Sequence, residues 1–134
     1  QAVLVNELMS RSSEKGFDKF TDIGKNAWNV FNAAGALAPH RRVYILTHPQ
    51  TDEAGKVRMK TVGKMVDQTL VPEGYFTIVL RTEKVNGNYL FRTQTNGQDC
   101  CKSPIDMFGD DTIENNLALV DTHIKAFYDI VEAA

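Results

Sequence analysis

The chain has 134 residues, of which 43% are hydrophobic and 24% charged, and its formal net charge at pH 7 is −2. This length suffices for one domain with its own core, so we expect a single domain over residues 1–134. The composition is that of a globular protein and excludes a fibrous or disordered chain. The nearly balanced charge excludes a general attraction to nucleic acid, so such a function must rest on a local patch. Because no apolar run is as long as a membrane span, we expect no membrane association.

The chain has two cysteines, Cys100 and Cys101, and they are adjacent. Adjacent cysteines do not easily bond to each other, and a single pair does not form the disulfide framework of a small secreted domain. With no histidine or second cysteine pair nearby, a zinc site is not expected. This cysteine usage favours a reducing cytoplasm.

The first residues are already apolar, and the chain begins at Gln1 without an initiator methionine. A natural N-terminus is usually polar and frayed. We therefore expect a piece of a longer polypeptide, although a processed start or a chosen boundary would look the same.

The first half of the chain predicts a helix and a buried strand. Gln1–Arg11 is read as either the end of a strand or the start of a helix, and a polar loop follows over Ser10–Gly16. Apolar residues at steps of three and four from Phe17 to Leu37 predict an amphipathic helix, which Pro39 ends. The β-branched, aromatic run Val43–Thr47 predicts a buried strand. A helix followed by such a strand indicates βαβ units and a largely parallel sheet.

The region between residues 61 and 95 predicts the remaining sheet. Apolar residues from Val62 to Leu70 predict one and a half helical turns, and a strand is expected over Tyr75–Thr82. Asn86-Gly87 is the strongest short hairpin signal in the chain. The sheet is thus expected to end in an antiparallel hairpin that pairs Tyr75–Val85 with Asn88–Thr95.

The C-terminal region predicts one more helix. Apolar residues recur at steps of three and four from Ile113 to Val131. The preceding Asp110-Asp111-Thr112 is expected to provide the N-cap, where acidic residues are favoured by the helix dipole.

A basic stretch lies between the two predicted strands and carries no acidic residue between its first and last lysines. Its cations are Lys56, Arg58, Lys60 and Lys64. Such a cluster holds phosphates by charge and counterion release. The alternative is a solvated loop that happens to be basic. Ligand sites in α/β sheets lie at strand ends, which favours the functional interpretation.

Two other pairs of residues are candidates for chemistry. Thr47 and His48 follow a predicted strand, where they are placed to sense a phosphate or position a water, although a histidine there is more often structural. Arg81 and Lys84 lie just before the hairpin turn, where the alternative role is to protect a sheet edge by charge. The sequence contains no GxxxxGK[ST] or GxGxxG phosphate loop, nor a GxSxG, HExxH or EF-hand motif.

Three stretches resemble one family along nearly the whole chain. They read THPQTDEAGKVRMKTVGKMVDQTLVPEGYFTIVLRT, NGNYLFRTQTNGQDCCKSPIDMF and DDTIENNL, and the most specific part is Gly55–Met65. They resemble the C-terminal part of phage-type RecA-like ATPases, the AAA family ATP-binding proteins of tailed phages associated with recombination and single-strand annealing. The resemblance implies an α/β fold: a partial RecA-like P-loop NTPase core whose mixed sheet is flanked by helices.

The resemblance also implies roles for individual residues. In that family the Walker A and Walker B segments lie upstream of such a chain, with Gln1 falling just after the Walker B strand. Thr47-His48 would match a sensor of the γ-phosphate, and Gln50–Lys64 would match a DNA-binding loop. Arg81 and Lys84 would occupy the region of the cationic fingers that reach a neighbouring subunit's nucleotide, although their spacing differs from the helicase pattern Lys-x-Arg-x-Gly.

These implications give one leading hypothesis and two alternatives. The leading hypothesis is part of an ATPase that acts on single-stranded DNA in recombination or replication, as a homo-oligomer in the host cytoplasm. ATP and Mg²⁺ would belong to the intact parent, and we expect neither cofactor binding nor ATP hydrolysis by this chain alone. The alternatives are a non-enzymatic interaction protein on a RecA-like scaffold and a single-strand nucleic-acid binder without ATPase function.

Overall fold

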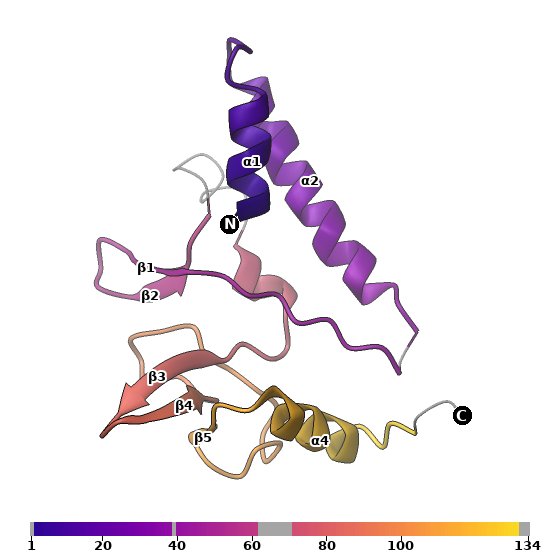
Figure 1. Cartoon of the computed structure of the whole chain (residues 1–134), viewed down its shortest axis with the longest axis vertical. Coiled ribbons are helices and arrows are strands. Elements are labelled where there is room, and N and C mark those ends of the chain that lie inside the picture. The colour runs from indigo at the N-terminus through magenta and orange to yellow at the C-terminus, as the bar shows by residue number, and fades with distance from the viewer. Residues whose placement is uncertain (1, 39, 62–70, 132–134) are drawn as a thin grey trace. The chain divides into compact units, whose positions relative to one another are not determined.

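The computed structural model describes residues 2–38, 40–61 and 71–131 of the chain (Figure 1). Their contacts divide the chain into two compact units. The first comprises Gln1–Gln50 and Arg58–Tyr75, and the second comprises Thr51–Val57 and Phe76–Ala134. The single domain expected over residues 1–134 stays a prediction. The described elements make a mixed α/β structure with helices and two small antiparallel sheets.

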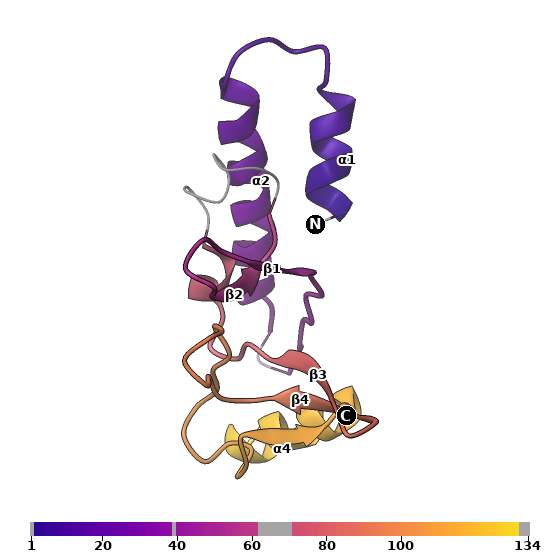
Figure 2. The same cartoon turned by 90° about the vertical axis from the view of Figure 1, so that its left-hand side faces the viewer.

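The first unit begins with two helices, α1 (Ala2–Ser10) and α2 (Asp18–Gly35), which lie side by side in Figures 1 and 2. The segment Gln1–Arg11, for which the sequence allowed either a strand end or a helix start, therefore contains a helix. Ile23 is fully buried, and Leu4, Leu8 and Phe31 pack against it and its neighbour Ala27. The helix predicted from Phe17 is confirmed, because its apolar residues at steps of three and four bury one narrow face.

The predicted apolar stripe extends beyond α2 and is wider than the face that the structure buries. Phe17, just before the helix, is 71% exposed, and Val30 within it and Leu37 after it are also exposed. The helix ends at Gly35, with Ala36 as its C-cap, so it stops before the predicted end. Pro39 itself lies outside the described residues.

The buried strand predicted over Val43–Thr47 is wrong. The segment carries no strand, and Leu46 within it is 80% exposed. A strand needs a neighbouring strand for its backbone hydrogen bonds. Among the described residues, no strand pairs with Val43–Thr47. The expectation of a largely parallel sheet is also wrong, because the described sheets are antiparallel.

A short hairpin follows instead, made of β1 (Pro49–Thr51) and β2 (Val57–Met59). The Asp52 carboxylate forms its turn by accepting the backbone N–H of Ala54 at 3.0 Å and of Lys56 at 2.8 Å. Gly55 has a φ of +81°, a conformation that glycine adopts without steric cost. Part of the predicted basic loop is therefore an ordered β-hairpin.

The chain after β2 differs from the predicted strand at Tyr75. The helical turns predicted over Val62–Leu70 lie outside the described residues. A 3₁₀ helix, η1, covers Pro72–Tyr75, and Phe31 of α2 packs its ring on Tyr75 with 5.7 Å between centroids. The predicted strand over Tyr75–Thr82 is thus wrong in its extent, because regular pairing begins only at Arg81.

The second unit contains a three-stranded antiparallel sheet in the order β3-β4-β5. Its strands are β3 (Arg81–Val85), β4 (Asn88–Arg92) and β5 (Thr112–Glu114). The predicted hairpin is confirmed: Asn86 and Gly87 have φ angles of 51° and 85°, and both positive values fit a type I′ turn. The core beside this sheet is formed by Phe91, Met107, Phe108, Ile113 and Val120.

The last helix begins later than predicted. Thr112–Glu114 pairs with β4, and the helix α4 spans Leu117–Phe127 beside the sheet (Figure 2). The side chain of Asn116 forms the N-cap by accepting the backbone N–H groups of Ala118 and Leu119, so the predicted cap at Asp110–Thr112 is wrong. Ile113 lies in β5 and not in a helix, and its buried side chain packs in the core with Phe91. No helix of the described residues has the length and apolar character needed to cross a bilayer.

Candidate functional site

The basic residues of the predicted loop follow one strand. Lys56, Arg58 and Lys60 occupy alternate positions along β2 and its ends. Successive side chains of a strand point to opposite faces, so these three cations share one face of the hairpin. Lys60 is exposed and the other two are half-buried. Lys64, the fourth predicted cation, lies outside the described residues.

His48 lies next to this strand. The backbone N–H of Lys60 donates to the His48 carbonyl at 2.8 Å, and the Thr47 hydroxyl donates to the same carbonyl at 2.9 Å. The structure thus brings a predicted sensor residue beside a predicted DNA-binding residue. Thr47 and His48 were predicted to follow a buried strand. In the structure the segment before them is not a strand and is largely exposed.

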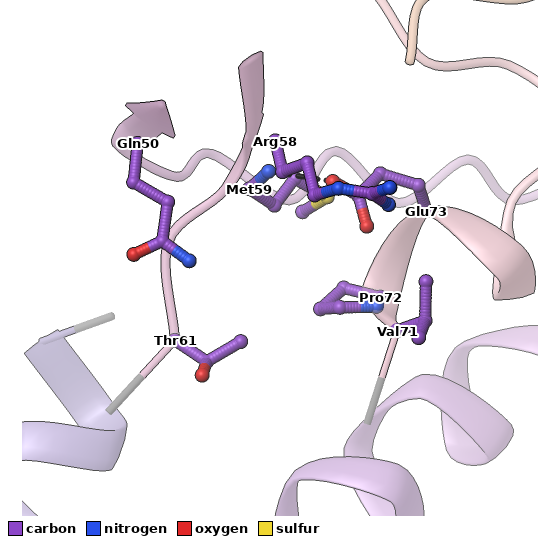
Figure 3. Close-up of a pocket in the computed structure, with 7 residues that line it drawn as sticks. All are labelled: Gln50, Arg58, Met59, Thr61, Val71, Pro72 and Glu73. Carbon is purple, nitrogen blue, oxygen red and sulfur yellow. Dashed lines mark hydrogen bonds between the residues drawn. The ribbon is translucent and has the colours of Figure 1, made fainter. Parts of the chain in front are cut away.

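A pocket of about 290 Å³ opens between the β1–β2 hairpin and η1 (Figure 3). In Figure 3, Gln50 and Thr61 lie on one side, Pro72 lies on the other, and the Arg58 side chain runs toward Glu73. Glu73 is buried, and its carboxylate accepts the backbone N–H of Met59, which ties η1 to β2. Sequence reasoning missed Glu73, because nothing local indicates that an acid in a Pro-Glu-Gly turn is buried.

Arg81 belongs to a network of charged side chains in the second unit. Its guanidinium lies 3.4 Å from the carboxylate of Asp99 and 3.9 Å from that of Glu83. Arg92 donates two hydrogen bonds to Glu83, at 2.7 and 2.9 Å. The Asp99 side chain is only 1% exposed, whereas that of Arg81 is 37% exposed. Arg81 is therefore paired with a buried carboxylate, while part of its own side chain remains accessible to solvent.

Lys84 does not join this network. It is three residues from Arg81 along β3, so the two side chains point to opposite faces of the sheet. The Lys84 ammonium instead lies 5.2 Å from the centre of the Tyr89 ring, on the paired strand. The structure therefore separates the two residues that the resemblance groups as cationic fingers.

Asp99 and Cys101 form the buried end of the network. Burial acts to raise the pKa of Asp99, but the Cys101 N–H, Thr95 and Arg81 together hold it below its ordinary value. Burial, with the charge of Asp99, raises the pKa of the Cys101 thiol to about 12. The thiol therefore stays protonated at neutral pH and is a poor nucleophile. The two cysteines are free thiols.

The Glu83–Arg92 pair makes the second unit sensitive to acid. Hydrogen bonds from Arg92 lower the pKa of Glu83, against the opposing effect of burial. A depressed carboxylate pKa contributes stability that is complete above its ordinary value of 4.5 and is lost as the pH falls through the lower folded value. Asp99 acts in the same direction, and Arg81 and Arg92 face both acids.

We expect the free energy of unfolding to fall below about pH 4.5, and the Glu83→Gln variant to lose less of its stability over that range. Urea unfolding at a series of pH values measures this. Glu114→Gln, at an exposed glutamate of β5, is the matched control and is expected to follow the original chain. Identical acid profiles for Glu83→Gln and the original chain would contradict the assignment.

Among the residues that the structure describes, no three His, Cys, Asp or Glu side chains are placed to hold a metal ion. The described side chains form a basic hairpin with an adjoining pocket, and a charged network around Asp99. No protein-family model, curated protein or solved structure matches this chain.

Proposed function

We propose that this chain is part of a phage RecA-like ATP-binding protein that acts on single-stranded DNA, and that the β1–β2 hairpin contacts the DNA. The observation that carries the proposal is the alternation of cations along β2 and its two flanking residues: Lys56, Arg58 and Lys60. The resemblance of the surrounding sequence to such proteins supports it.

The geometry of a strand suits this role. Alternate side chains of a strand repeat roughly every 6.5 Å, a distance that lets successive cations follow the phosphates of an extended single strand. Proteins that bind single strands without sequence preference use a positively charged surface of this kind. The Asp52 turn and Gly55 hold the hairpin in shape before DNA binds, which reduces the entropy lost on binding.

ATP binding is assigned to the intact parent. The chain contains no glycine-rich phosphate-binding loop. We therefore assign the main contacts to the ATP phosphates to a part of the parent outside this chain. Within the proposed assembly, Thr47 and His48 would sense the γ-phosphate, and Arg81 would reach a neighbouring subunit's nucleotide. Arg81 suits that role better than Lys84, because Arg81 is paired with Asp99 and partly exposed, whereas Lys84 lies over the Tyr89 ring. ATP turnover by the purified chain alone would contradict this division.

The triple variant Lys56→Ala, Arg58→Ala, Lys60→Ala tests the DNA contact. Each phosphate contact to a single strand contributes about 0.7 to the slope of log affinity against log salt, so losing three should lower that slope by about 2. We expect the affinity for a labelled oligothymidylate to fall with it, as measured by fluorescence anisotropy at several salt concentrations.

The matched control removes the same charge from exposed positions away from the hairpin: Lys15→Ala, Lys25→Ala and Arg41→Ala. We expect this control to change the slope much less. Equal losses in the two variants would mean that net charge alone attracts DNA. Unchanged affinity in the hairpin variant would show that β2 is not the contact.

Exposed apolar side chains in the first unit favour a second candidate, a non-enzymatic interaction protein. Val3, Met9, Phe17 and Val30 are all more than half exposed. Apolar residues left in water in such numbers mark contact surfaces for protein partners. Tight self-association that is independent of nucleotide, in a concentration series of size measurements, would favour this candidate over the DNA-binding one.

A further inference from the structure

The pocket beside β2 combines chemistry that neither a metal nor a simple anion requires. The Gln50 amide and the Thr61 hydroxyl each carry a hydrogen-bond donor and an acceptor. Met59, Val71 and Pro72 also line the pocket and add apolar surface. The buried Glu73 carboxylate disfavours an anion, and Arg58 disfavours a bare cation.

These features favour a neutral, flat ligand with a polar edge. The volume of about 290 Å³ is at the lower limit of pockets for small organic ligands, which is enough for one aromatic ring system. A nucleobase has apolar faces and an edge of donors and acceptors, and glutamine amides pair with such edges.

The pocket is continuous with the proposed DNA contact. Arg58 both lines the pocket and belongs to the row of cations on β2. A phosphate near Arg58 would therefore lie close to the pocket. The hydrogen bond from the Met59 backbone N–H to the Glu73 carboxylate joins the two walls of the pocket.

We propose that this pocket takes up one unstacked base of the bound single strand, an inference that rests on the DNA-binding function proposed above. The polar edge of the base would meet Gln50 and Thr61 and its faces would contact Pro72 and Met59. Its phosphates would stay outside the pocket, along the cations of β2. The proposal adds a base contact to a site otherwise formed only by cations.

The full chain tests the proposal with two probes of equal length, an oligothymidylate and an abasic oligonucleotide that carries the same phosphates. We expect the base-bearing probe to bind roughly fivefold tighter or more, since contacts to a single base typically contribute at least that factor. The salt dependence should be the same for both, because the phosphates are shared. Equal affinity for the two probes would overturn the base pocket and leave the cation row standing.

Two variants test whether the pocket causes the preference for the base-bearing probe over the abasic one. Gln50→Met keeps the side-chain volume and removes the amide, and Thr61→Val removes only the hydroxyl, so each should reduce the preference without changing the salt slope. Gln98→Met is the matched control, because this exposed glutamine bonds β2 only through its backbone carbonyl, to Val57, and does not line the pocket. If Gln50→Met and Thr61→Val both retain the full preference, the pocket is not the base site. If neither probe binds the original chain, the proposed DNA-binding function itself fails.

Discussion

Replacing Asp99 by alanine is expected to lower the free energy of unfolding of the second unit by about 3 kcal/mol. The carboxylate accepts the Cys101 backbone N–H at 3.1 Å and faces Arg81 at 3.4 Å. Its removal leaves a buried N–H without its acceptor and a guanidinium without its closest carboxylate. Urea unfolding monitored by amide hydrogen exchange in β3 and β4 measures the loss.

Two further variants separate the sources of this stability. Asp99→Asn retains an oxygen for the Cys101 N–H but loses the charge, so we expect a smaller loss than with alanine. Asp110→Ala, at an exposed aspartate of the same unit, is the control and is expected to cost about 0.5 kcal/mol or less. A loss for Asp99→Ala no larger than that of the control would refute a stabilising role for the network.

Replacing Phe91 by alanine is expected to cost about 3–5 kcal/mol, because the change removes a large ring from a packed core and leaves a cavity. Phe91 is 9% exposed in β4 and belongs to the cluster that includes Ile113 and Val120. We expect the hydrogen-exchange protection of β4 and β5 to collapse in this variant. The fluorescence of Trp28, the sole tryptophan, reports the first unit independently.

Tyr89→Ala is the matched control for this change. Tyr89 is in the same strand but is 59% exposed. Its ring contacts the Lys84 ammonium, an interaction worth about 1 kcal/mol at most at an exposed site. Similar losses for the two variants would mean that burial at Phe91 is not what stabilises the sheet.

Local sequence signals predicted the elements that depend on neighbouring residues. Asn86-Gly87 determines its hairpin because the two residues accept the positive φ angles that a type I′ turn requires. The apolar residues at helical spacing around Ile23 determined α2 in the same way, since they need only one partner helix to bury them. The cations of β2 were also visible in the sequence, although their common face was not.

Tertiary structure decided every feature that depends on a distant partner. Val43–Thr47 has the composition of a buried strand, yet backbone pairing requires a neighbour that local sequence does not specify. Ile113 fits a helical pattern but is buried from β5, because pairing with Phe91 stabilises it there. Burial of Glu73 and Asp99 follows from contacts 14 and 18 residues away in sequence, with Met59 and Arg81. Local patterns determine turns and helices, whereas burial and charge pairing are set by the contacts that folding brings together.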